Sequence, residues 1–191
     1  MKDSRKLPET FGDDELDAVA AGAEGWLATM IQLSANAGLR MGEVLAIEIG
    51  DIDFDHGALM VRRALSAGEV LSPKSGDERV VPLTPELAAH LRKVVADRPR
   101  NVRVVLTEDR KTPRRQDVLR RLKRLLRKLG LQERSFHSLR HSFLTRLVRR
   151  GASVEAVRML AGHSSLLVTE RYVHATASDL HRAISLLSKA G

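Results

Sequence analysis

The spacing of apolar residues changes twice along this chain of 191 residues, and those changes restrict the fold more than any other feature. From Trp26 to Leu33 apolar side chains recur every three or four positions, which is typical of a helix. Between residues 51 and 82 short alternating stretches flank turn sequences, which indicates strands. After Pro82 the helical spacing returns and continues to the end. The pattern predicts an α+β, mainly α-helical domain with a small three-stranded antiparallel sheet near residues 51–82.

Two hairpins are expected within the sheet region. The sequence DIDFDHGALMVRR, residues 51–63, predicts a strand, an Asp-His-Gly turn and a second strand. The sequence GEVLSPKSGDERVVPL, residues 68–83, predicts a hairpin whose tip spans residues 73–77, because Pro and Gly favour turns. The helix that follows should begin at Thr84 and Pro85, since Thr is a good cap and Pro is favoured at the first helical position.

The composition points to a polyanionic partner. The chain has 32 Lys and Arg against 24 Asp and Glu, a formal charge of +8. Nucleic acid is the first candidate, although membrane-surface and ribosomal proteins share such a balance. There is no Cys, which excludes disulfides, a thiol nucleophile and a thiolate metal site. The sequence contains neither a signal-peptide pattern nor an apolar run long enough to cross a membrane, so we expect a cytoplasmic protein without a membrane partner.

Five short stretches carry polar residues in apolar surroundings, and together they suit an anionic reaction centre. The planar fork of arginine matches two phosphate oxygens at once. A phenol becomes a good nucleophile only where cations or a base help to remove its proton. A lysine can protonate a leaving alkoxide. The candidate catalytic residues are Arg40, Lys74, His137, Arg140, His163 and Tyr172, the last being the single Tyr of the chain.

The order and local sequences of these stretches resemble those of the catalytic domain of the tyrosine recombinases, the phage-integrase family. The sequence AGLRMGEVLAIEIGDIDF is similar to the box of the first arginine, HSLRHSFLTRLV to the His-x-x-Arg box, and LAGHSSLLVTERYVH to the stretch that ends at the nucleophile. The likeness runs from about Leu33 to His174, fills all six expected positions in order, and favours phage or mobile-element integrases.

The resemblance implies a metal-free transesterification that needs no cofactor. Tyr172 would attack the scissile phosphate of duplex DNA, which leaves a 3′-phosphotyrosyl bond and a free 5′-hydroxyl. Arg40, Arg140 and His163 would hold the non-bridging oxygens and stabilise the negative charge of the transition state. A 5′-hydroxyl would then reverse the step, so the bond energy is conserved.

The resemblance also implies two proton-transfer groups. Lys74 would protonate the departing 5′-oxygen, although Arg79, five residues further on, competes with it for this role. His137 would accept or relay the proton of the tyrosine.

Three further residues are candidates for supporting roles. Glu43 lies three positions after Arg40, so an ion pair between them could fix the direction of the guanidinium. His141 lies one helical turn after His137, a spacing that suits zinc, but no third ligand follows at a sensible distance, so we expect no metal site. We expect His141 to pack or to support its neighbours, and His174 either to support the tyrosine or to be exposed.

A basic face accompanies the leucine stripe of residues 114–130. Such a face is commonly just solvated, but the net charge and the family resemblance favour contact with the DNA backbone. Its members are Arg120, Arg121, Lys123, Arg124, Arg127 and Lys128.

The resemblance divides the chain into a catalytic domain, residues 1–177, and a C-terminal helix or tail, residues 178–191. The apolar stripe of that tail could dock on a neighbouring subunit or fold back on its own domain. The N-terminal DNA-binding domain of the family is expected to be absent from this chain, since only some forty residues precede Arg40; the chain is then either a catalytic fragment or a naturally minimal protein. We therefore expect the chain alone to bind DNA weakly and in a salt-sensitive way. We also expect it to self-associate on DNA, where members of the family form a tetrameric synapse.

Two other functions fit the same residues. A type IB topoisomerase shares the nucleophile and the cationic groups but relaxes supercoils without exchanging partners. A DNA-binding regulator could keep the fold without catalysis, although the complete set of six residues favours an enzyme.

Overall fold

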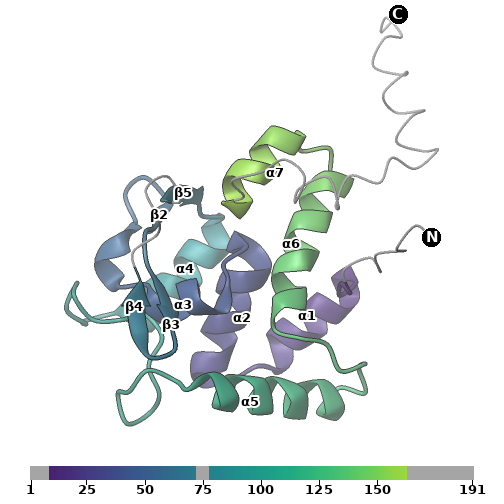
Figure 1. The fold of residues 1–191 in the computed structure, drawn as a ribbon, viewed down its shortest axis with the longest axis horizontal. Coiled ribbons are helices and arrows are strands. Elements are labelled where there is room, and N and C mark those ends of the chain that lie inside the picture. Colours follow the sequence, from purple (N-terminus) through teal and green to yellow (C-terminus); the bar gives the residue numbers. More distant parts are fainter. Residues whose placement is uncertain (1–8, 72–77, 163–191) are drawn as a thin grey trace, which may run out of the picture.

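The computed structural model describes residues 9–71 and 78–162, and this part of the chain is built mainly from helices (Figure 1). The helices are α1 (Asp13–Gly22), α2 (Gly25–Ala37), α3 (Met41–Ala46), α4 (Pro85–Val95), α5 (Arg115–Lys128), α6 (His137–Arg149) and α7 (Val154–Ala161). The strands are β1 (Ile52–Asp53), β2 (Ala58–Val61), β3 (Ala64–Ser66), β4 (Glu69–Leu71) and β5 (Arg79–Pro82), and a 3-10 turn, η1 (Ile49–Asp51), precedes β1.

Helix α2 forms the centre of the core. It packs against α1, α3, α4, α5 and α6, and its side chains are buried on several faces, among them Met30, Ile31 and Leu33. A helix that is apolar nearly all round is stable only when other elements cover it. The last turn of α2 leads to the loop at Gly38, which lies in the first candidate box.

The predicted three-stranded antiparallel sheet is confirmed, with the order β1-β2-β5. Its strands lie within residues 52–82, and Met60 of β2 stands opposite Val80 of β5. The predicted turn around His56 joins β1 to β2, and Thr84 caps α4 by accepting a hydrogen bond from the backbone N–H of Leu87 at 3.3 Å.

The predicted pairing of the second hairpin is wrong. Strand β4 pairs with β3, and β5 pairs with β2, so the strands that flank residues 72–77 do not pair with each other. The turn of the β3–β4 hairpin is Ala67–Gly68, whose φ angles are +50° and +90°. Such turns favour Asn-Gly or Gly-Gly, and Ala is an unusual residue there, which is why the sequence did not reveal it. Residues 72–77, and Lys74 with them, lie outside the described residues.

Within residues 9–71 and 78–162, no helix is long and apolar enough to span a bilayer.

Candidate active site

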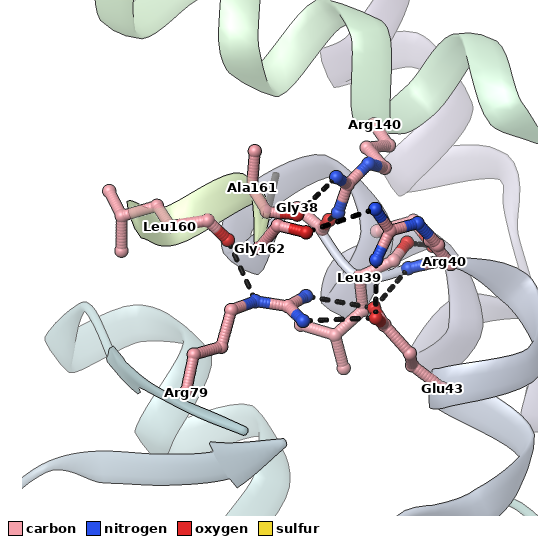
Figure 2. A network of polar contacts seen from close by, with 10 residues as sticks. Gly38, Leu39, Arg40, Glu43, Arg79, Arg140, Leu160, Ala161 and Gly162 are labelled. Carbon is pink, nitrogen blue, oxygen red and sulfur yellow. Dashed lines mark hydrogen bonds and ion pairs between the residues drawn. The ribbon is translucent and has the colours of Figure 1, made fainter. Parts of the chain in front are cut away.

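Three arginines from distant parts of the chain meet at the C-terminal end of α7 (Figure 2). Arg79 donates from Nε to the carbonyl of Leu160 at 2.8 Å, and Arg140 donates from Nη2 to the carbonyl of Ala161 at 2.5 Å. Arg40 donates from Nη2 to the carbonyl of Gly162 at 3.4 Å. The last carbonyls of a helix have no partner within it and carry the negative end of its dipole, so cationic donors stabilise this end.

The loop between α2 and α3 positions Arg40. Gly38 ends α2 with φ +69°, and a Cβ added there would lie 2.5 Å from the ring of Phe143. Glycine is therefore needed both for the left-handed backbone and for the close approach of α6. Arg40 itself is the N-cap residue directly before α3, and its backbone N–H donates to Oε2 of Glu43 at 2.7 Å.

Glu43 holds two guanidinium groups. Its Oε1 accepts from Nη1 of Arg40 at 2.9 Å, so the predicted ion pair is present. Arg79 donates to both oxygens of the same carboxylate, at 2.9 and 2.8 Å. Burial alone would raise the pKa of Glu43, but the hydrogen bonds and charge of Arg79, with those of Arg40, lower it to about 2. Glu43 is therefore ionised at any physiological pH.

Arg140 joins two segments of the site. It comes from α6, is only 1% exposed, and donates to the carbonyls of Gly38 and Ala161. The side chain of Arg40, in contrast, is 42% exposed. Arg40 can thus meet a ligand from solvent, whereas direct contact with Arg140 needs a local rearrangement around its guanidinium.

His137 and His141 lie together at the start of α6. Their ring centroids are 4.3 Å apart and the rings meet edge to face. Partial burial of the ring, and then the charges of Arg140 and Arg40, lower the pKa of His137, although the residue as a whole is exposed. A neutral imidazole can accept a proton. The residues that the structure describes contain no group of three or more His, Cys, Asp or Glu side chains that could hold a metal ion.

Arg79 is a site residue whose environment the sequence did not indicate. We considered it as a rival to Lys74, yet it is 9% exposed and bonded through Nε, Nη1 and Nη2. Strand β5 alternates, with Arg79 and Val81 buried and Val80 exposed. An arginine at an inward position of a strand needs a buried anion as its partner. The alternation of β5 could therefore have indicated a buried ion pair, but not that Glu43 is the partner.

Four candidate residues lie outside the part of the chain that the structure describes: Lys74, His163, Tyr172 and His174. His163 directly follows Gly162 in the chain, and the carbonyl of Gly162 accepts a hydrogen bond from Arg40.

Helix α5, which carries the basic residues, lies at the opposite end of the domain from α7 (Figure 1). The guanidinium of Arg121 stacks on the ring of Trp26, in the first turn of α2, with 4.6 Å between its carbon and the ring centroid. Gly38 follows the last turn of α2, about 18 Å along that helix.

Several of these basic side chains also have acidic partners. Arg120 pairs with Asp117, and Lys123 and Arg127 both pair with Glu133. Arg121 lies 3.7 Å from Glu108.

Comparison with known proteins identifies relatives of this chain. The model of the phage integrase family matches residues 12–179. The tyrosine recombinase XerA of Thermococcus kodakarensis is 34% identical over 160 residues, which cover 81% of this chain and 52% of the relative. The chain thus spans about half the length of that relative.

Solved structures share the fold. The integrase of the transposon Tn1549, in complex with a circular intermediate DNA, matches with a TM-score of 0.82 and 19% identity, over 97% of this chain and 68% of the other. A crystal structure of XerA recombinase matches with a TM-score of 0.74 and 22% identity, over 97% and 65%.

Proposed function

This chain belongs to the phage integrase family, and from that premise we propose that it cuts and rejoins duplex DNA through a covalent bond to Tyr172. The relatives are named as recombinases and integrases, which favours strand exchange over relaxation of supercoils by a topoisomerase. Self-association on DNA and a cytoplasmic location are part of the same proposal.

The observation that carries the proposal is the meeting of Arg40 and Arg140 at the end of α7. The two residues are far apart in sequence, yet both donate to carbonyls of adjacent residues, Ala161 and Gly162. His163 is the next residue of the chain. Of the three groups expected to hold the phosphate, Arg40 and Arg140 therefore meet here, and His163 is the next residue after this point in the chain.

The chemistry follows from the charges. The phenolic oxygen of Tyr172 attacks phosphorus while its proton passes to His137, whose lowered pKa favours the neutral, accepting form. The bond from phosphorus to the 5′-oxygen breaks, and that oxygen takes a proton from Lys74. The positive charge of Arg40 and Arg140 stabilises the additional negative charge on the non-bridging oxygens. Attack by a 5′-hydroxyl on the phosphotyrosine reverses each transfer.

A covalent capture experiment tests the proposal. Duplexes with a randomised centre and a nick are first enriched by binding to the chain, then incubated with it and separated on a denaturing gel. The nick lets the short 5′ fragment diffuse away, so an adduct accumulates. We expect a protein band that carries labelled DNA, abolished by Tyr172→Phe, which removes one oxygen. No adduct on DNA that the protein binds would contradict the proposal, and so would an adduct that persists in Tyr172→Phe.

A further inference from the structure

We propose that Arg79 is a positioning residue of this site: it fixes Glu43, and through Glu43 the guanidinium of Arg40, and it ties both to the end of α7. The inference rests on the proposed function of Arg40 as a phosphate-binding group. It assigns Arg79 no contact with DNA.

The geometry of Arg79 joins three separate elements. The residue stands on β5, Glu43 on α3 and Leu160 on α7. Its Nη1 and Nη2 donate to the two oxygens of Glu43, while Nε donates to the carbonyl of Leu160. These three bonds use the planar fork of arginine, which a lysine ammonium cannot reproduce. With 7% of its side chain exposed, against 42% for Arg40, Arg79 is the internal member of the pair.

The shared carboxylate explains how Arg79 acts on Arg40. Each oxygen of Glu43 accepts one bond from Arg79 and one from Arg40: Oε1 from the two Nη1 atoms, and Oε2 from Nη2 of Arg79 and the backbone N–H of Arg40. Without Arg79 the carboxylate loses the bonds that hold its plane. The guanidinium of Arg40, nearly half exposed, then keeps a carboxylate that is held less firmly and the longer bond to the carbonyl of Gly162.

Gly162 shows that Arg79 also fixes the end of α7. A Cβ added at Gly162 would lie 2.9 Å from Nη1 of Arg79 and 3.2 Å from its Cδ. The guanidinium therefore occupies the space that a side chain at position 162 would need, directly before His163. Arg79 thus sets the positions of two segments of the site, the start of α3 and the end of α7.

Arg79→Lys tests the inference, with Arg63→Lys as a matched control. Arg63 also pairs with a buried carboxylate, that of Asp51 at 2.5 Å, but it contacts neither Glu43 nor α7 in the described structure. Small errors in placing a reacting group cost up to about 100-fold in rate. We expect Arg79→Lys to slow adduct formation on the enriched nicked duplex by about 10- to 100-fold, with unchanged DNA affinity, and Arg63→Lys to change the rate less than about twofold.

A pH profile separates positioning from mere folding. Glu43 faces Arg40, Arg79 and, from α6, His137. Weaker bonds to Arg79 should raise the pKa of Glu43, because burial disfavours the charged carboxylate and fewer interactions then oppose that effect. The rate of Arg79→Lys should therefore fall further below the wild-type rate as the pH drops from 8 to 5. Titration of His137 occurs in both proteins, so the ratio of their rates removes most of its contribution. The double variant Arg79→Met with Glu43→Gln, which has no carboxylate to titrate, should be slow at every pH without this additional fall.

The outcomes are distinct. A wild-type rate for Arg79→Lys, or a loss that is the same at every pH and tracks a lowered melting temperature, overturns the positioning role. If Arg79→Lys does not fold, the neutral double variant replaces it, and a wild-type rate there overturns the role equally. Absence of any adduct with the wild-type chain contradicts the proposed function itself, before Arg79 is considered.

Discussion

The guanidinium of Arg140 donates to the carbonyl of Gly38, which lies 102 residues earlier in the chain. This bond joins the first turn of α6 to the loop that ends α2, and the other end of the same guanidinium reaches α7. Arg140 is therefore part of the internal structure of the domain as well as a candidate ligand of phosphate.

Replacing Gly38 by Ala should destabilise the domain strongly. A Cβ would lie 2.5 Å from the ring of Phe143, and φ is +69°. The left-handed backbone costs about 1–2 kcal/mol for a residue with a Cβ, and the overlap adds to this. We expect a loss of about 3 kcal/mol in urea unfolding, of which the overlap is a strain of about 1–3 kcal/mol. Gly151→Ala is the control, because φ is +86° but nothing lies within 4 Å of the added atom, so only the backbone cost of about 1–2 kcal/mol should remain. Equal losses in the two variants would contradict the close approach of α6.

The ion pairs of Glu43 should appear in the pH dependence of stability. The pKa of Glu43 is about 2 in the folded protein, below the ordinary value of 4.5. The unfolded chain therefore binds the proton first, so the stabilisation is complete above about pH 5 and is lost as the pH falls towards 2. The shift corresponds to about 3 kcal/mol.

Urea unfolding of the wild type and Glu43→Gln between pH 7 and pH 3 measures this effect. The variant should be less stable at pH 7, and the difference should shrink as the pH falls. Glu69→Gln, on the exposed strand β4, is the control for the loss of a carboxylate. A difference between wild type and Glu43→Gln that stays constant with pH would show that Glu43 is not held ionised by Arg79 and Arg40.

The turn at Ala67–Gly68 predicts a stabilising substitution. Ala67 has φ +50°, which glycine adopts without strain and asparagine adopts more readily than alanine. Ala67→Asn should raise the free energy of unfolding by about 0.5–1 kcal/mol, measured in urea. Destabilisation instead would contradict the left-handed conformation of Ala67 in this turn.

The placement of α5 predicts which basic residues contribute to DNA binding. Arg124 and Lys128 lie beside Gly22 and Leu27, at the end of α2 opposite to the arginine cluster. If DNA binds at the cluster alone, Arg124→Ala with Lys128→Ala leaves the slope of log affinity against log salt unchanged. Contact of both with the backbone, as the sequence predicted, would reduce the slope by about two. Fluorescence anisotropy from 50 to 300 mM salt distinguishes the two results.

The sequence predicted the helices and the three-stranded sheet because each depends on local spacing and turn residues. The Thr84–Pro85 helix start and the stripe of α5 needed no tertiary information. The same local rules missed the Ala67–Gly68 turn, because the consecutive strands β2 and β3 pair with two different returning strands, β5 and β4. Pairing of that kind is a long-range property.

The site shows the same division. The family sequence motifs identified Arg40 and Arg140 as candidates. The i,i+3 spacing then predicted that Glu43 is the partner of Arg40. The second partner of Glu43 stands 36 residues away on a strand, so no local spacing could reveal it. Nor could the sequence show that the carbonyls of Leu160, Ala161 and Gly162 each receive a different arginine.

Peptide mapping of the DNA adduct tests the account most directly. After nuclease and trypsin digestion, cleavage at Arg171 and Arg182 releases residues 172–182, which contain the single Tyr of the chain. Mass spectrometry should find the residual nucleotide on Tyr172 in the wild type, and much less of it in Arg40→Ala and Arg140→Ala. A nucleotide attached to any other residue, or an undiminished yield in both arginine variants, would contradict the account.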